Sequence, residues 1–105
     1  MRYSRRRRTR WDKSQSVMMK ELELRGYSVH STADVGEGFP DLVVGKYGLT
    51  KIVEVKRLDE TKNPKPTKLR ESQVRFRREW RGDPLLVAVT AEEVVAWFER
   101  HKPLR

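Results

Sequence analysis

Apolar side chains recur at helical spacing near the start of the chain. Positions that lie i, i+4, i+7 and i+11 apart share one face of a helix, and here such a face is formed by Trp11, Gln15, Met18, Met19 and Leu22. The spacing predicts a helix over residues 12–25, with Gly26 well placed to end it. One polar residue, Gln15, shares this otherwise apolar face.

Three runs rich in β-forming residues follow, at residues 27–32, 39–45 and 50–57. A glycine-bearing loop separates the first two runs. The second and third are joined by residues 46–49, KYGL, a four-residue connection that predicts a hairpin. If Gly45 pairs with Thr50, the numbers of facing residues sum to 95 along the hairpin.

The second half of the chain repeats the change from extended to helical patterns. Residues 58–67 are polar, with two prolines, and predict a loop; a helix over residues 68–80 then stacks Leu69, Gln73, Phe76 and Trp80 on one face. The apolar run at residues 85–89 predicts a buried strand. Thr90 and Glu93 form a capping-box pattern for a last helix that extends to about His101.

The predicted order αβββαβα belongs to the α/β class and fits one domain, residues 11–105. Residues 1–10 contain six arginines and almost nothing apolar, so they cannot order themselves by burial. We expect them to form a flexible basic arm.

Charge and composition narrow the partners. The chain has 24 Lys and Arg against 15 Asp and Glu, a net charge of +9, which favours a polyanion such as nucleic acid. There are no cysteines, which excludes disulfides, zinc ribbons and thiol nucleophiles. No long apolar run predicts a membrane span, and the basic start lacks the apolar segment of a signal peptide. We therefore expect a cytoplasmic protein without membrane association.

Two carboxylates and a lysine are predicted to lie next to one another on the same face of the hairpin. Side chains alternate along a strand, so Glu54 and Lys56 point the same way, and the register that sums to 95 puts Asp41 opposite Glu54. Facing like charges repel, and a divalent cation such as Mg²⁺, with Mn²⁺ as a substitute, resolves the repulsion. Such a site supports phosphodiester hydrolysis, with Lys56 stabilising charge. The alternative is that E-V-K is only a solvent-facing stripe, which is its usual meaning.

The motifs in this order resemble the PD-(D/E)XK nuclease superfamily. The resemblance covers about residues 12–100 and is carried by GEGFPDLVVG, then IVEVKR, then ESQVRFRREW followed by a glycine and an apolar strand. Among its branches the chain is most similar to the archaeal Holliday junction resolvases and the VRR-NUC nucleases. The combined spacing is specific, whereas each piece alone is not.

The resemblance implies a restriction-endonuclease-like αβββαβ core, a mixed sheet flanked by helices, with an additional C-terminal helix. It implies a homodimer that cleaves branched DNA, above all four-way junctions, with Mg²⁺, in DNA recombination and repair. Asp41, Glu54 and the backbone carbonyl of Val55 would be the metal ligands and Lys56 the catalytic lysine. Gln73 matches a glutamine of the helix after the E-x-K strand, although a structural glutamine at the edge of the core is as good an explanation.

One position departs from the family. Related resolvases place a glutamate in the first helix near the metal, and this chain has Gln15 there, which puts metal affinity and a second metal in doubt. Glu21 and Glu23 point away from the apolar face and are poor substitutes. Ser31 and Thr32 lie where resolvase-like proteins carry a hydroxyl near the scissile phosphate, although a solvated turn explains either one better.

Basic residues outside this constellation are candidates for DNA contact. Between Lys62 and Arg81 there are eight basic residues and two acidic ones, more than solubility requires, although a solvated helix face is their commonest fate. The candidates are Arg5, Arg6, Arg7, Arg8, Arg10, Arg57, Lys62, Lys65, Lys68, Arg70, Arg77 and Arg81. His30 and His101 lack the spacing of a metal site, so we expect structural or surface roles for both.

Three functions remain open from the sequence alone. The first is a Mg²⁺-dependent endonuclease, with a dimeric Holliday junction resolvase ahead of a VRR-NUC-type nuclease or nickase on other DNA structures. The second is a non-catalytic basic nucleic-acid-binding protein. The third is a nuclease-fold subunit that assists a partner enzyme, which the substitution at Gln15 keeps open. The sequence does not define the dimer surface, the cleavage preference, or a cellular or viral origin.

Overall fold

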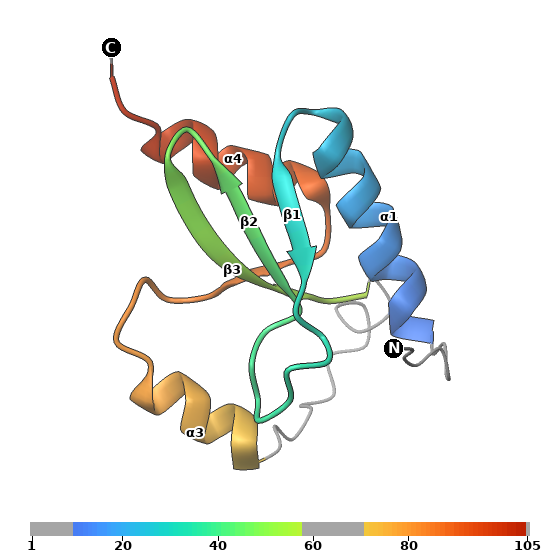
Figure 1. The fold of residues 1–105 in the computed structure, drawn as a ribbon, viewed down its shortest axis with the longest axis vertical. Helices are drawn as coiled ribbons and strands as arrows, with labels where there is room; N and C mark the ends of the chain where they lie inside the picture. Colours follow the sequence, from blue (N-terminus) through green and yellow to red (C-terminus); the bar gives the residue numbers. More distant parts are fainter. Residues whose placement is uncertain (1–9, 58–70, 105) are drawn as a thin grey trace.

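A computed structural model describes residues 10–57 and 71–104 (Figure 1). Its elements are, in order, α1 (Arg10–Leu24), β1 (Ser28–Ser31), β2 (Leu42–Lys46), β3 (Leu49–Val55), α3 (Glu71–Glu79), β4 (Leu86–Ala88) and α4 (Ala91–His101). The predicted αβββαβα order and the α/β class are confirmed. The segment 1–9, the whole of the predicted loop at 58–67 and the start of the second predicted helix lie outside the described residues.

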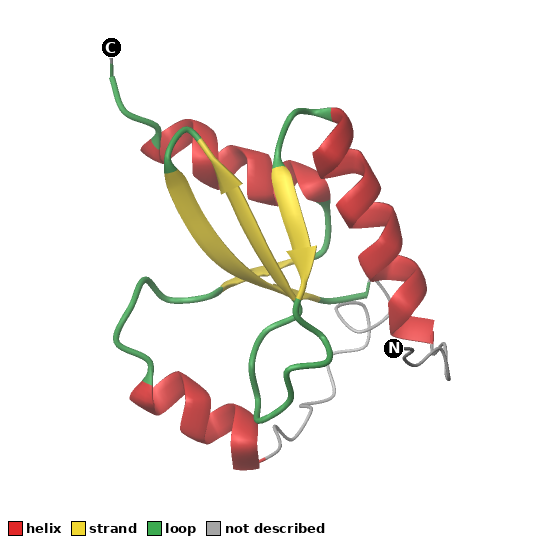
Figure 2. Cartoon of the chain, in the orientation of Figure 1, coloured by secondary structure: helices red, strands yellow, loops and turns green. Residues whose placement is uncertain are grey.

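The sheet has four strands in the order β1-β2-β3-β4 (Figure 2). β1, β2 and β3 form an antiparallel meander, and β4 joins β3 in the parallel sense. The mixed sheet is therefore as predicted. A parallel neighbour requires a crossover connection, and the chain from β3 to β4, which includes α3, provides it.

The β2–β3 hairpin has the predicted register but a tighter turn. Gly45 pairs with Thr50 as expected, and the ladder continues to Lys46 and Leu49. Only Tyr47 and Gly48 remain in the turn, with φ of 57° and 77°. The expected four-residue connection is thus wrong, because a two-residue turn with two positive φ angles matches the twist of the paired strands.

Helix α1 begins and ends with recognisable signals. It begins at Arg10, which therefore belongs to the helix and not to the basic arm. At its end the Gly26 amide donates to Glu23 O and the Tyr27 amide to Leu22 O, both at 3.0 Å. Gly26 has a φ of 88°, so this is the glycine-terminated end that the sequence predicts.

Helices α1 and α4 pack on the same face of the sheet (Figure 1). The core between them and the strands consists of Met18, Leu22, Tyr27, Val29, Leu42, Val44, Val53, Ala88, Ala91, Val94 and Phe98. Val95 and Trp97 are half-buried against this core, so packing within the chain accounts for the wide apolar arc of α4. None of the described helices is long and apolar enough to span a membrane.

β4 is not the buried strand that its apolar sequence predicts. Only Ala88 is buried, while the Val87 side chain is 46% exposed. β4 lies at the edge of the sheet, and Val87 alternates with Leu86 and Ala88 so that it points away from the face that α1 and α4 cover. Within the part of the chain that the structure describes, only one face of β4 is covered. The apolar run therefore does not indicate a strand that is buried on both faces.

Helix α3 lies beyond the end of the sheet, beside the loop that precedes β2 (Figure 1). Phe39 of that loop contacts Phe76 and Trp80 edge-on, with ring centroids 5.3 and 6.4 Å apart. Gly38 approaches so closely that an added Cβ would lie 2.2 Å from Ser72 O. No residue of α3 is fully buried, so these loop contacts hold the helix in place.

A polar network joins the hairpin turn to the end of α4. The Tyr47 hydroxyl donates to Glu99 Oε2 at 2.6 Å, and Lys102 Nζ donates to Glu99 Oε1 at 2.7 Å. Hydrogen bonds from Lys102 and then from Tyr47 lower the pKa of Glu99 below its usual 4.5. At the other end of α4, Thr90 and Glu93 form the predicted capping box.

Replacement of Gly38 by alanine should loosen α3. Gly36→Ala is the matched control, because Gly36 and Gly38 have φ of 78° and 79° but no atom lies within 4 Å of a Cβ on Gly36. Both variants incur the left-handed backbone strain of about 1–3 kcal/mol. Only Gly38→Ala should also shift Trp80 fluorescence and show the larger loss in urea unfolding; equal losses would contradict the contact.

Glu99→Gln should reduce stability at neutral pH and not in acid. A carboxyl whose folded pKa is lowered stabilises the fold above its ordinary pKa, and that contribution disappears as pH falls through the lowered folded value. The difference in unfolding free energy between wild type and variant should therefore shrink below about pH 4. Glu23→Gln on α1 is the exposed control, and a difference independent of pH would contradict this account.

Candidate active site

The first element of the site is a contact between α1 and the end of β1. Gln15 is 6% exposed, and its Nε2 donates to Ser31 Oγ at 2.8 Å. The Gln15 Oε1 atom is buried without a hydrogen-bond partner. A buried amide oxygen normally has a partner, so this atom has an unused acceptor position inside the protein.

Thr32 ties the chain after β1 to the chain before β2. Its amide donates to Asp41 O at 2.7 Å and its hydroxyl donates to Pro40 O at 2.8 Å. Both bonds lie just beyond the β1–β2 ladder, which ends at Ser31 and Leu42. The backbone of the P-D dipeptide is therefore fixed from one side by Thr32, and the Ser31 and Thr32 hydroxyls are engaged within the protein.

Asp41 is fixed from the other side by β3. Its amide donates to Val53 O at 3.0 Å, and its Oδ2 accepts a hydrogen bond from the Val55 amide at 2.8 Å. Val53 and Val55 flank Glu54, so Asp41 lies across from Glu54. The Asp41 amide bonds to Val53, however, one residue before the Glu54 that the register pairs with Asp41. The ladder proper ends at Leu42 and Val53. The carboxylate thus takes the place of a main-chain acceptor where the ladder stops.

Glu54, Val55 and Lys56 continue along the end of β3. Glu54 pairs with Val87 of β4, and the Lys56 amide donates to Ala88 O at 2.9 Å. Glu54 and Lys56 are both half-buried, as is Asp41. The strand pairing on both sides therefore holds the E-x-K segment next to the aspartate, and each of the three side chains is partly exposed.

The ion that the sequence predicts at these groups is a hydrated Mg²⁺. Mg²⁺ is held in proteins by one or two carboxylates, with water and substrate phosphate completing its shell, and Asp41 and Glu54 are two such carboxylates. In residues 10–57 and 71–104 no group of three or more His, Cys, Asp or Glu could hold a metal. Any further protein ligand in this part of the chain would be a neutral oxygen, and the partnerless Gln15 Oε1 is one.

Gln73 lies on α3, half-buried, where the helix meets the loop before β2. Gly38 lies three residues before Asp41, and its backbone packs against Ser72 and Gln73. The aromatic contacts of Phe39 hold the same loop and helix together. Gln73 therefore lies beside the segment that carries the aspartate, and its predicted catalytic contact stays a prediction.

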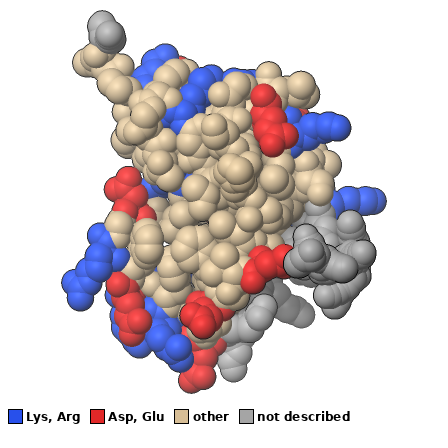
Figure 3. Space-filling model, in the orientation of Figure 1, with Lys and Arg blue, Asp and Glu red and all other residues tan. Residues whose placement is uncertain are grey.

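The basic residues are only partly described. Arg57 is half-buried at the end of β3, and Arg77 and Arg81 are exposed in and after α3, where Arg78 and Glu79 also form an ion pair of 3.9 Å. The side chains of Arg5, Arg6, Arg7, Arg8, Arg10, Lys62, Lys65, Lys68 and Arg70 lie outside the described residues. Figure 3 shows a face whose middle is largely uncharged, with acidic and basic groups around it.

Other side chains behave as surface or structural groups. His30 is exposed on β1, and His101 stacks on Trp97 with centroids 4.4 Å apart while its Nδ1 contacts Trp97 O at 2.8 Å. The sequence analysis missed the two bonds from Thr32 and the bond from Val55 to Asp41. The signal for Thr32 was available, since hydroxyl residues near strand ends often bond to neighbouring backbone.

Comparison of the chain with protein-family models, curated protein sequences and solved structures gives no significant match.

Proposed function

We propose that this chain is a metal-dependent DNA endonuclease, with four-way junctions as its substrate. The observation that carries the proposal is the hydrogen bond from the Val55 amide to Asp41 Oδ2, which sets one carboxylate beside the E-V-K segment. It counts against the view that Glu54 and Lys56 are only a solvated stripe. The net charge of +9 supports a polyanionic substrate.

Each of the three side chains has a distinct role in this proposal. Asp41 and Glu54 hold Mg²⁺ or Mn²⁺, which when bound supplies positive charge that acidifies water and offsets phosphate charge. Lys56, the next outward-facing position after Glu54, orients the attacking water or stabilises the negative charge that develops on the phosphate. The hydrogen bond at Asp41 orients its carboxylate before the substrate arrives.

Paired cuts across a junction require two active sites related by a two-fold axis, so the proposed active species is a homodimer. The sheet face opposite α1 and α4 is compatible with such a partner. Ser28, His30 and Thr50 are exposed there, and Val87 is 46% exposed. The binding-only alternative is favoured by one observation, the neutral Gln15 at the position where a third acidic ligand is expected.

The purified protein should nick a labelled four-way junction symmetrically when Mg²⁺ is present and not when a chelator is present. Glu54→Gln should abolish cleavage, and Lys56→Met should slow it about 10²–10³-fold, because each removes a group that acts on charge in the transition state. Lys20→Met, an exposed position on α1, is the control and should cut normally. The measurement is single-turnover cleavage on a denaturing gel.

The matching linear duplex separates the alternatives in the same assay. Equal cleavage of duplex and junction would contradict junction specificity and favour a nuclease of broader range. Binding of the junction without cleavage by any divalent metal would contradict catalysis and leave a nucleic-acid-binding protein.

Gln15→Glu should strengthen metal binding while weakening the metal-free protein. A carboxylate at this buried position is costly without a cation, although the Ser31 hydroxyl can turn to donate to it. Addition of Mn²⁺ should therefore raise the melting temperature more for Gln15→Glu than for wild type, through preferential binding to the folded state. Calorimetric titration of Mn²⁺ measures the affinity directly.

Gln15→Leu is the companion variant, because it removes both polar atoms of the amide at similar size. If Gln15 Oε1 is a ligand, this variant should bind Mn²⁺ more weakly than wild type. Equal Mn²⁺ affinity in all three proteins would show that the amide has no part in metal binding and is only a structural link to β1.

A further inference from the structure

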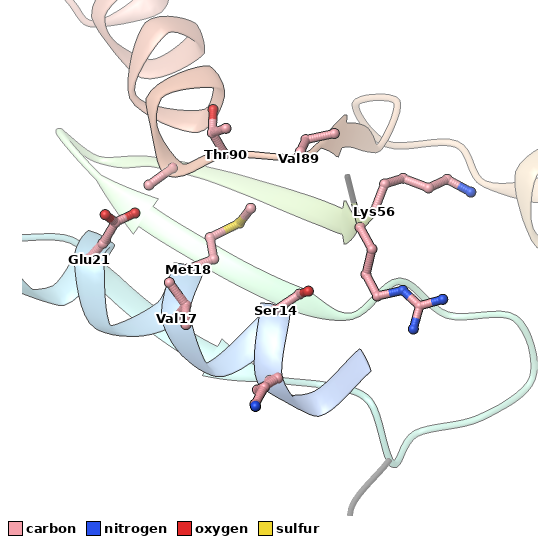
Figure 4. Close-up of a pocket in the computed structure, with 10 residues that line it drawn as sticks. Ser14, Val17, Met18, Glu21, Lys56, Val89 and Thr90 are labelled. Atoms are coloured by element: carbon pink, nitrogen blue, oxygen red, sulfur yellow. The ribbon is translucent and has the colours of Figure 1, made fainter. Parts of the chain in front are cut away.

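A pocket of about 440 Å³ lies next to Lys56, between α1, the end of β3 and the start of α4. Figure 4 shows Val17 and Met18 of α1 facing Val89 and Thr90 across it, with Lys56 beside them. Its volume is in the range of small-ligand sites. Of the residues that line it, Lys56 belongs to the candidate active site and Arg57 is a candidate for DNA contact, whereas the others have no role in the proposed function.

The lining combines an aliphatic surface with hydroxyl groups. Val17 and Val89 present carbon atoms, which suit the flat face of an aromatic ring, and the Met18 side chain borders the pocket from the buried core. Ser14 and Thr90 add hydroxyls that both donate and accept hydrogen bonds. A nucleobase has this combination of an apolar face and a polar edge.

The charges at the pocket favour an anion. Among the described residues, three cationic ones, Lys13, Lys56 and Arg57, line it together with one carboxylate, Glu21. Lys13 comes from the first turns of α1 and the other two from the end of β3, so positive charge approaches from both walls. Phosphates on either side of a base would meet this charge.

We propose that the pocket holds one unpaired nucleotide of a DNA strand, with its base against Val17, Met18 and Val89 and its phosphate near Lys13. The choice of DNA rests on the proposed nuclease function. A base inside an intact duplex is stacked and paired and cannot enter, whereas an unpaired base enters without the cost of unstacking. Since Lys56 belongs to both the pocket and the catalytic group, the nucleotide lies next to the phosphate that is cut. The protein therefore prefers DNA in which a base next to the cleavage site is unpaired, and at a four-way junction that base is one freed from pairing at the branch point.

The test measures binding in the presence of chelator, so that metal-dependent cleavage does not interfere. One duplex carries a single unpaired 2-aminopurine, and its partner is the same duplex fully paired. Wild type should bind the first about tenfold more tightly, the scale of one base–side chain stack, and should change its 2-aminopurine fluorescence. Equal affinity for the two duplexes would overturn the proposal.

Val17→Trp fills the pocket from a residue that is 58% exposed, and Leu24→Trp is the matched control on the same helix, 81% exposed and outside the pocket. Thermal unfolding verifies that both variants fold. Val17→Trp should reduce the preference to less than about twofold, whereas Leu24→Trp should retain it. The same preference in both variants would overturn the proposal.

The two proposals fail in different ways. A protein that prefers the unpaired base in chelator but cuts nothing with Mg²⁺ would support the pocket and contradict the nuclease. A protein that cuts junctions but shows no preference in chelator would contradict the pocket alone.

Discussion

The candidate site depends on how the chain is held just before β2. Where the ladder stops, Thr32 donates two hydrogen bonds to the backbone of Pro40 and Asp41, and Val55 donates its amide to the Asp41 side chain. A carboxylate with one oxygen on a backbone amide has a defined orientation, which a free loop aspartate lacks. Without these bonds Asp41 would be a surface acid at a loop end, with no fixed position beside Glu54 and Lys56.

Much of this arrangement was predictable because it follows from local rules. The order of elements came from periodicity, the end of α1 from Gly26, and the register of the hairpin from the pairing of Gly45 with Thr50. Register determines which side chains face one another, so the position of Asp41 across from Glu54 could be derived from residue numbers. The buried position of Gln15 likewise followed from its place on an apolar helical face.

What could not be predicted depends on tertiary contacts. The apolar residues of β4 suggested full burial, but burial depends on what covers each face, and Val87 lies on a face that α1 and α4 do not cover. Helix α3 was predicted from its stripe, yet its contact with Gly38 and Phe39 involves residues more than thirty positions away. The Val55 amide donates to the Asp41 side chain and not to a main-chain oxygen of the ladder. The alternation of side chains along a strand does not predict such a bond.

The meander of β1, β2 and β3 has a consequence for the order in which the molecule assembles. The bonds from Gln15, Thr32 and Val55 that shape the site all join residues 15–55, whereas β4 joins β3 only after the long crossover. Contacts between segments close along the chain form with less loss of chain entropy than a parallel pairing across many residues. We therefore expect the acidic centre to form before β4 pairs with β3, so that the edge strand completes a scaffold around groups that have already met.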